Sequence, residues 1–337
     1  MQGIIIFECS INSYIFAFTN KNNNVQKGLV IKSTGSWYHV LNNDKVVIEC
    51  KIRGKFRTKG IKTTNPVAVG DKVDFRLDEK TGQGVIVAIS PRKNYIIRKS
   101  INLSRQAHIL AANVDQALLI VTLAKPKTYP EFIDRFLVSA EAYSIPAKII
   151  FNKIDLYDND TLEALQDLIS IYSKIGYDCF SISAKLNKGV SEIADLLANK
   201  ISVIAGHSGI GKSTLINTIQ PGLNLKTNEI SEYHESGMHT TAFPEMHDLD
   251  NNAYIIDTPG IKGFGVIDME KEEISHFFPE MFAVLENCQY YNCTHSHEPN
   301  CAVKQAVQKG DISATRYKSY INLLIGDDNE KYRTVPY

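Results

Sequence analysis

A glycine-rich segment followed by a lysine and a serine is the first part of this sequence that could do chemistry. Residues 206–213 read GHSGIGKS and lie between the apolar run ISVIA and the helix-forming run STLINTI. This pattern between a strand and a helix is typical of a loop whose backbone N–H groups surround nucleotide phosphates. We expect Lys212 to contact the β- and γ-phosphates and Ser213 to bind Mg²⁺. The predicted phosphate-binding set is Gly206, His207, Ser208, Gly209, Ile210, Gly211, Lys212, Ser213 and Thr214.

The base is predicted by a second motif, NKID, which follows the apolar run AKIIF. The carboxylate of Asp155 can accept hydrogen bonds from both the N1–H and the exocyclic amine of guanine. Adenine lacks that donor pair and would leave the charge unpaired, at a cost of about 1–3 kcal/mol or more. We expect Asn152 to brace the loop, Lys153 to cover the ring, and the Ala184 N–H of a later SAK segment to reach the guanine oxygen. The predicted guanine-binding set is Asn152, Lys153, Asp155, Ser183, Ala184 and Lys185.

Two further segments have the composition of nucleotide switches: GMHTT, and DTPG after the run AYIID. We expect Asp257 to hold Mg²⁺ through water and the Gly260 N–H to contact the γ-phosphate. Either Thr240 or Thr241 can supply a direct Mg²⁺ ligand, and Thr241 is favoured. A GTP-binding enzyme that alternates between GTP and GDP is therefore indicated.

The residue after DTPG is Ile261, at the position where Ras-type GTPases carry a water-orienting glutamine. An aliphatic side chain cannot orient water, so intrinsic hydrolysis should be slow. Either His239 or an external partner is expected to complete the catalytic site. The alternative for His239 is an ordinary surface histidine.

The order of these motifs is unusual. The guanine motifs at 152–155 and 183–185 precede the phosphate loop at 206–213 and the switches at 237–241 and 257–260. In the common small GTPase arrangement the phosphate loop comes first. The sequence therefore predicts a circularly permuted GTPase, an arrangement tolerated because domain termini usually lie close together. Because DTPG directly precedes the C-terminal region, we expect loss of the γ-phosphate to be transmitted there.

Three cysteines and a histidine crowd together near the C-terminus. Cys288, Cys293, His295 and Cys301 have the composition and spacing of a structural tetrahedral zinc site. His297 could replace His295, and the alternative without metal is three buried thiols.

Basic residues alternate along one strand-like segment of the N-terminal region. Alternation places them on one face of a strand, with Ile52 and Phe56 on the other. A solvated charged edge is one explanation. In a chain of zero net charge, we favour contact with an RNA backbone. The predicted RNA-binding residues are Lys51, Arg53, Lys55, Arg57 and Lys59.

These residues require a multidomain α/β protein. Short strands over 28–92 predict an OB-type β-barrel, and 93–112 is expected to be a linker. Alternating strands and helices over 113–268 predict a mostly parallel sheet covered on both faces. Residues 269–337 are expected to form a helical zinc module. Residues 1–27 fit no targeting template and are expected to be an extension that contributes little to function, with a downstream start, an extra strand or a peripheral membrane contact as alternatives.

Composition limits the class of protein. The chain has 337 residues, of which 44% are hydrophobic and 22% charged, as in globular proteins, so wholesale disorder is excluded. Six cysteines are too few for a disulfide scaffold in a chain of this length. The interior has no run of eighteen apolar residues, so a membrane span there is not expected. We expect a cytoplasmic monomer.

The sequence resembles the ribosome small-subunit-dependent GTPase A family of bacteria over roughly residues 28–325. The resemblance implies that the protein binds the maturing small ribosomal subunit and its rRNA, acts late in assembly, and hydrolyses GTP with stimulation by the subunit. Met238 and Ala242 depart from the family pattern, which usually has Arg and a third Thr there. The motifs that carry the resemblance are NPVAVGD at 65–71, IIRKS and AANVDQ within 96–116, GHSGIGKSTLIN at 206–217, GxHTT at 237–241, DTPG at 257–260, and C-x4-C-x-H-x-x-EP-x-CAV at 288–303.

Two other functions remain open at this point. The chain could be a permuted GTPase that serves another ribosomal particle. Alternatively, it could be a zinc-containing RNA-binding adaptor that uses GTP as a structural ligand without turning it over.

Overall fold

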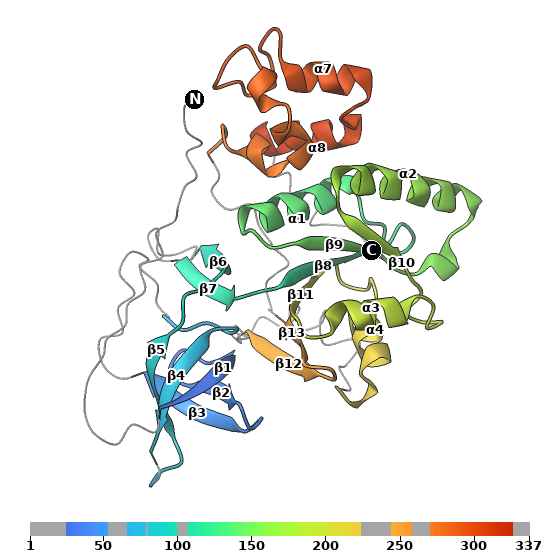
Figure 1. The fold of residues 1–337 in the computed structure, drawn as a ribbon. Coiled ribbons are helices and arrows are strands. Elements are labelled where there is room, and N and C mark those ends of the chain that lie inside the picture. The colour runs from blue at the N-terminus through green and yellow to red at the C-terminus, as the bar shows by residue number, and fades with distance from the viewer. Residues whose placement is uncertain are drawn as a thin grey trace, which may run out of the picture. The chain divides into compact units, whose positions relative to one another are not determined.

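The structure is a computed structural model (Figure 1). It describes residues 25–52, 66–78, 80–99, 107–223, 244–257 and 270–325. The chain forms two compact units, of which the first runs to Asn113 and includes Phe243–Met246. The predicted extension, residues 1–27, lies outside the described residues apart from 25–27, which begin the first strand.

The first unit contains a closed five-stranded barrel. Its strands are β1 (Val25–Ser33), β2 (Tyr38–Asn42), β3 (Val47–Ile52), β4 (Lys72–Leu77) and β5 (Gly84–Ile89). They pair in the order β1-β2-β3-β5-β4, and β4 pairs again with β1, which closes the barrel. Alternate side chains such as Val30, Val40, Val73 and Phe75 fill the interior and are almost completely buried. The prediction of an OB-type barrel is confirmed.

The segment after the barrel, where we expected a linker, contains strands. β6 (Tyr95–Lys99) and β7 (Ala107–Ala112) pair antiparallel. The turn of the NPVAVGD motif packs on this ribbon: a Cβ at Gly70, whose φ is +91°, would lie 2.0 Å from the Ala112 carbonyl oxygen. Asp71, fully buried, pairs with Arg92 at 2.6 Å. This ion pair fixes the turn against the start of the ribbon.

The second unit is built on a mostly parallel sheet in the order β10-β9-β8-β11-β13-β12. The strands are β8 (Gln116–Val121), β9 (Ala147–Phe151), β10 (Asp178–Ser181), β11 (Ile201–Ala205), β12 (Glu245–Leu249) and β13 (Ala253–Asp257). β8 is buried at every residue because helices cover both faces of the sheet. β8, β9, β10, β11 and β13 are parallel, as predicted.

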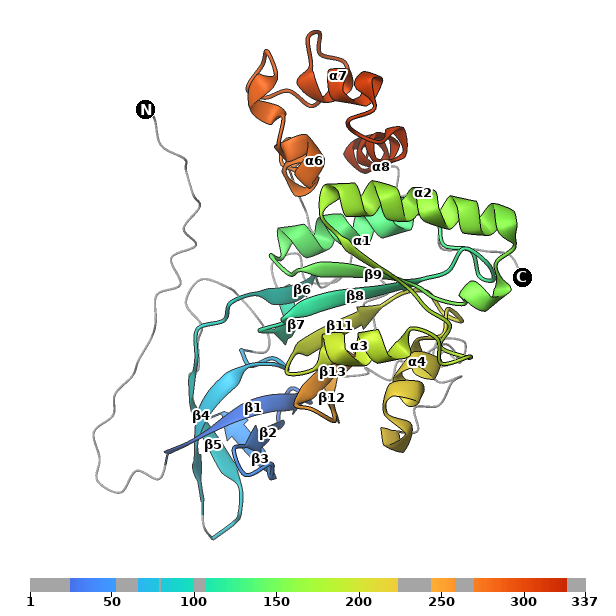
Figure 2. The same cartoon turned by 45° about the vertical axis from the view of Figure 1, so that its right-hand side comes forward.

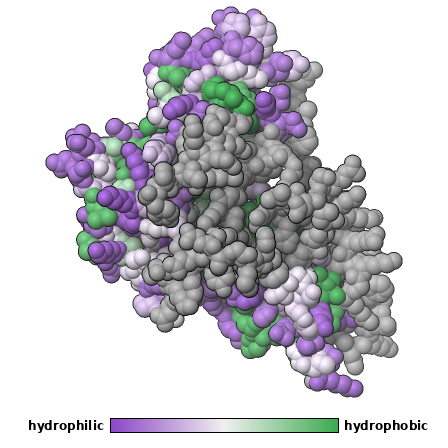
Figure 3. Space-filling view, turned by 180° about the vertical axis from the view of Figure 1, so that it is seen from behind, coloured by the Kyte–Doolittle hydropathy of each residue, from purple (hydrophilic) through white to green (hydrophobic). Residues whose placement is uncertain are grey.

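Helices lie on both faces of this sheet. Figures 1 and 2 show α1 (Pro130–Ala142) and α2 (Asn159–Ile175) on one face, and α3 (Val190–Leu197) and α4 (Lys212–Ile219) on the other. Along the described ranges, each helix is too short or too polar to cross a lipid bilayer. Seen from behind, the described surface is largely hydrophilic, with hydrophobic side chains in small patches (Figure 3).

The C-terminal module is helical, as expected. It consists of the short turns η4 (Ile274–Phe277) and η5 (Leu285–Asn287), and the helices α6 (Pro279–Phe282), α7 (Ala302–Lys309) and α8 (Ala314–Ile325). Its core gathers Phe278, Met281, Val303 and Tyr320, and it also includes Val138 of α1. One side chain of a helix that covers the parallel sheet therefore belongs to the core of this module.

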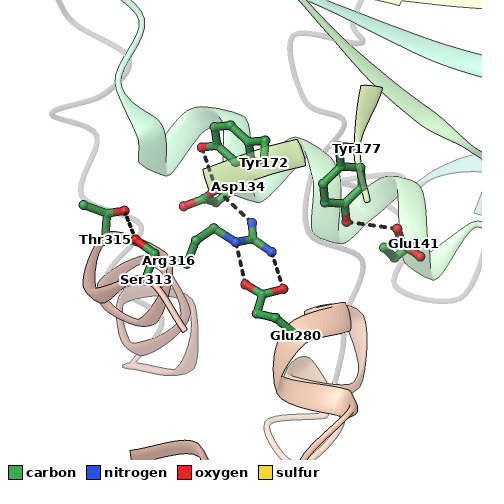
Figure 4. A network of polar contacts seen from close by, with 8 residues as sticks. All are labelled: Asp134, Glu141, Tyr172, Tyr177, Glu280, Ser313, Thr315 and Arg316. Atoms are coloured by element: carbon green, nitrogen blue, oxygen red, sulfur yellow. Dashed lines mark hydrogen bonds and ion pairs between the residues drawn. The ribbon is translucent and has the colours of Figure 1, made fainter. Parts of the chain in front are cut away.

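A buried ion cluster joins α1 to the same module (Figure 4). The Arg316 guanidinium of α8 donates to Asp134 of α1 at 2.8 Å and to both carboxylate oxygens of Glu280 at 2.7 and 3.1 Å. The Tyr172 hydroxyl donates to the same Asp134 oxygen at 2.9 Å. Burial raises the pKa of Asp134, and the Arg316 charge opposes that shift. The guanidinium thus balances the fully buried Asp134 carboxylate and the largely buried Glu280 carboxylate.

Candidate nucleotide site and metal centre

The predicted phosphate loop has the backbone of a phosphate cradle. It begins where β11 ends, and α4 starts at Lys212. Gly206, Gly209 and Gly211 have φ angles of +143°, +75° and +96°, a region that disfavours other residues. A Cβ at Gly206 would lie 2.3 Å from the Ile120 carbonyl oxygen, and one at Gly211 would lie 2.5 Å from Asn152 Nδ2. Both glycines are therefore required for this loop to close against its neighbours.

The side chains of the phosphate loop are divided between core and surface. Ile210 is fully buried in the hydrophobic core and Ser213 is almost buried at the first turn of α4, whereas Ser208 is exposed. The Lys212 ammonium donates to the carbonyl oxygens of Gly206 and His207, at 2.7 and 2.5 Å. The lysine is thus held over the loop, where we expect the phosphates to bind.

His207 leans on the ring of Phe132 from α1, with ring centroids 3.8 Å apart. Burial, and secondly the Lys212 charge, lower the pKa of His207. A neutral imidazole at this position adds no positive charge to the loop, so Lys212 supplies the cation. Phe132 and Asp134 lie two residues apart on α1, so the same helix contacts the phosphate loop and the C-terminal module.

Asn152 joins three loops. Its side-chain amide donates to the Ile210 carbonyl at 2.8 Å and accepts from the Ala184 N–H at 3.0 Å, and the residue is buried. The phosphate loop, the NKID loop and the SAK loop therefore meet at one side chain. Its bracing position is the one expected for Asn152. The Ala184 N–H donates to Asn152 in this structure, and its contact with a guanine oxygen stays a prediction.

Lys153 adopts the left-handed backbone conformation, with φ +64°. Its ammonium donates to the Gly209 carbonyl at 2.6 Å and to the Lys125 carbonyl at 2.7 Å. Burial lowers the pKa of Lys153, partly offset by Asp155. The Ser183 hydroxyl donates to the Asp155 carboxylate, which keeps that carboxylate beside the SAK loop. Of the other predicted residues here, Lys185 is exposed, and Gly209 and Thr214 lie in the phosphate loop and in α4.

Sequence reasoning missed the loop that follows β8. Residues 122–129 supply the carbonyl of Lys125 to Lys153, and Pro126 faces Gly209, with its Cδ 3.7 Å from the Cβ position of that glycine. The sequence carried one usable signal, because ligands of doubly wound sheets bind at the carboxyl ends of the strands. Residues 122–129 occupy that position after β8 just as NKID does after β9. The same rule therefore predicts that polar residues of the loop after β8 belong to the candidate nucleotide site.

Several predicted site residues lie outside what the structure describes. Asp257 ends β13, and only its backbone is described.

Of the predicted RNA-binding residues, Lys51 is described. It lies on β3, with its ammonium 3.8 Å from the centroid of the Trp37 ring. The predicted residues outside the described ranges are Arg53, Lys55, Arg57, Lys59, His239, Thr240, Thr241 and Gly260.

The Cys/His cluster is assembled as its spacing indicated. The ligating atoms of Cys288, Cys293, His295 and Cys301 all lie within 4.8 Å of one another. His295, buried, has its Nδ1 3.4 Å from the Cys301 sulfur and 3.6 Å from that of Cys288. His297 is exposed, and its Nδ1 lies 2.9 Å from the Ser296 hydroxyl. The structure therefore selects His295 over His297 for the cluster, and this Cys₃His donor set could hold a zinc ion.

Two family models match the chain. One, described as RsgA GTPase, matches residues 89–267, and the other, described as RsgA N-terminal domain, matches residues 27–86. The chain belongs to the RsgA GTPase family. This confirms the predicted family and the prediction of a GTP-hydrolysing enzyme. Such a family implies binding of GTP, GDP and Mg²⁺.

Relatives of the RsgA family match over nearly their full length. One from Bacteroides thetaiotaomicron, named small ribosomal subunit biogenesis GTPase RsgA 2, is 59% identical over 307 residues, which are 91% of this chain and 99% of the relative. One from Christiangramia forsetii, named small ribosomal subunit biogenesis GTPase RsgA, is 53% identical over 313 residues, which are 92% of this chain and 99% of the relative.

Two solved structures share the RsgA fold. The crystal structure of YjeQ from Thermotoga maritima is similar with a TM-score of 0.74 and 36% identity, covering 90% of this chain and 98% of that one. The structure of YloQ, described as a circularly permuted GTPase, gives a TM-score of 0.70 and 30% identity, covering 95% of this chain and 100% of that one. The prediction of a barrel, a permuted GTPase and a Cys₃His module is confirmed.

Proposed function

We propose that this chain hydrolyses GTP during maturation of the small ribosomal subunit, to which it binds. One observation carries the proposal: Asn152 ties the phosphate loop, the NKID loop and the SAK loop together in a chain of the RsgA family. Relatives with more than half of their residues identical are named for biogenesis of this subunit. We propose further that the chain acts late in assembly, as a monomer in the cytoplasm, with its hydrolysis stimulated by the subunit.

The base and the phosphates are assigned to separate loops. Asp155, held by Ser183, would accept the two guanine donors, and the Lys153 stem would lie over the ring. Lys212 would move from the carbonyls it contacts here to the β- and γ-phosphates. The guanine loop thus selects the nucleotide, and the phosphate loop positions the bond that is cleaved.

The metal ions have different roles. Ser213 and Thr241, with Asp257 through water, would hold Mg²⁺, which neutralises phosphate charge when bound. The Gly260 N–H would contact the γ-phosphate, and His239 or the ribosomal subunit would complete the site for water attack. A zinc ion held by Cys288, Cys293, His295 and Cys301 would be structural, because four protein ligands leave no position open for substrate.

The barrel is proposed to bind rRNA. Lys51 on β3 is the described member of the basic run, and its ammonium lies over the ring of the half-buried Trp37. A cation beside an aromatic ring suits contact with phosphate and base together. Arg53, Lys55, Arg57 and Lys59 would extend that surface. The domain boundaries at residues 28, 93, 113 and 269 remain part of this proposal.

Phosphate release from GTP and from ATP, with and without purified small subunits, tests the proposal. We expect the chain to hydrolyse GTP but not ATP, and the rate of GTP hydrolysis to rise when the subunit is added. The Lys212→Ala variant should hydrolyse neither nucleotide. Tight GTP binding without turnover would instead support the RNA-binding adaptor. If only another ribosomal particle stimulated hydrolysis, that particle would be the partner instead of the small subunit. Unchanged turnover in Lys212→Ala would overturn the site assignment.

A further inference from the structure

A single tyrosine hydroxyl connects the guanine loop to the loop after β8. Tyr157 directly follows the short turn η1 (Ile154–Leu156) and is half-buried. Its hydroxyl accepts from the Leu123 N–H at 2.8 Å and donates to the Asn152 carbonyl at 2.9 Å. The Thr122 hydroxyl lies 3.3 Å away. Burial raises the pKa of Tyr157, so the phenol stays protonated and can act as donor and acceptor at once.

The Asn152 carbonyl belongs to the peptide that precedes Lys153. That peptide sets the φ angle of Lys153, which is +64°. A non-glycine residue persists in this region only when its surroundings hold it there, because the conformation costs about 1–3 kcal/mol. The Tyr157 hydroxyl fixes this peptide directly. With this left-handed backbone, the Lys153 ammonium reaches the Gly209 carbonyl of the phosphate loop.

The loop after β8 is held at two points. Tyr157 binds its Leu123 N–H, and Lys153 binds its Lys125 carbonyl. The same two residues meet at the Asn152–Lys153 peptide. The guanine loop and the loop after β8 are therefore held together by one hydroxyl and one ammonium.

We propose that Tyr157 is a positioning residue for guanine nucleotides: its hydroxyl holds the NKID loop in the conformation that binds the base. This inference rests on the proposed function. Among the described residues the Tyr157 hydroxyl contacts Leu123, Thr122 and Asn152, none of which belongs to the phosphate loop. We therefore expect it to act on nucleotide affinity and to leave hydrolysis of bound GTP unchanged.

The test is Tyr157→Phe in the full chain, which removes the hydroxyl and keeps the ring. Tyr177→Phe is the matched control, because its buried hydroxyl donates to Glu141 at 2.9 Å elsewhere in the same unit (Figure 4). We expect the affinity of Tyr157→Phe for GDP to fall about tenfold, the effect of one buried hydrogen bond. The value of kcat at saturating GTP and the GDP affinity of the control should match the wild type. Amide exchange at Leu123 should accelerate in Tyr157→Phe alone.

Three results would overturn the inference. They are GDP affinity of Tyr157→Phe within twofold of the wild type, an equal loss in Tyr177→Phe, or a fall in kcat with affinity unchanged. Failure of the proposed function looks different. If the wild-type chain does not bind GDP, both the proposed function and the role of Tyr157 are wrong. If the wild type binds GDP in preference to ADP and Tyr157→Phe binds GDP equally well, only the role of Tyr157 is wrong.

Discussion

Arg316 of α8 donates to Asp134 of α1 across 2.8 Å, and both side chains are almost completely excluded from solvent. The two residues are 182 positions apart in the chain. Removing one partner of a buried ion pair leaves the other charge without compensation. This pair therefore fixes the C-terminal module to α1 more firmly than any surface contact between the same helices.

Replacing Arg316 by methionine should destabilise the second unit by about 3–5 kcal/mol, because the fully buried Asp134 and the largely buried Glu280 would be left without a cation. Urea unfolding followed by far-ultraviolet circular dichroism measures this change in the free energy of unfolding. Lys318→Met is the matched control, since Lys318 also pairs with α1, with Glu131 at 3.4 Å, but is 68% exposed. Its cost should be about 0–1 kcal/mol. Equal costs for the two variants would contradict the importance of burial.

Gly211→Ala should weaken nucleotide binding strongly. The added Cβ would lie 2.5 Å from Asn152 Nδ2, so the amide that joins the three loops would be displaced. Calorimetric titration with GDP should show a loss of at least about tenfold, since a buried hydrogen bond is lost and strain is added. Gly310→Ala provides the comparison, because Gly310 has φ +78° with no atom within 4 Å of its Cβ position. It should lose some stability and keep GDP affinity, and a variant at Gly211 with normal affinity would refute the cradle.

Asp155→Asn should weaken the preference for GTP over ATP. A neutral amide cannot accept both guanine donors, so GTP affinity should fall about tenfold to a hundredfold, as for lost charge-assisted hydrogen bonds. Competition between the two nucleotides against a fluorescent GDP analogue gives the ratio. Asp158→Asn is a neighbouring control: Asp158 caps α2 by accepting from the Thr161 N–H at 2.9 Å, and Asn caps equally well. Unaltered selectivity in Asp155→Asn would argue against the guanine assignment.

Cys301→Ser should lower the zinc content of the purified chain from one ion towards none. Because binding of a structural metal contributes to the folding free energy of its module, losing the ion should make α7 and α8 exchange amide protons faster than in the wild type, while exchange in the sheet changes less. Elemental analysis and hydrogen exchange of the full chain provide the two measurements, and a chelator should reproduce the effect. Cys179→Ser removes a half-buried thiol on β10, outside the cluster, and should change neither. A Cys301→Ser chain that retained one zinc ion would disprove the ligand set.

Contiguous patterns were sufficient to predict the two centres. The phosphate loop, NKID and the Cys/His spacing each place reacting groups within a few residues, where backbone geometry determines what they can reach. The contacts that hold these centres were not predictable in the same way. Tyr157 and Leu123, or Arg316 and Asp134, are common residue types whose meeting depends on how distant elements pack. Strand and helix alternation predicts the sheet, but it does not predict which hydroxyl or guanidinium will cross between elements.

The dual role of α1 has a consequence for dissecting this protein. Its Phe132 supports the phosphate loop, while its Val138 and Asp134 are enclosed by the C-terminal module. A fragment ending at residue 257 would expose Val138 to solvent and leave Asp134 without Arg316, on the helix whose Phe132 packs against the phosphate loop. We therefore expect the parallel sheet and its helices to lose stability when they are produced without the C-terminal module, because that module covers Val138 and Asp134 of α1.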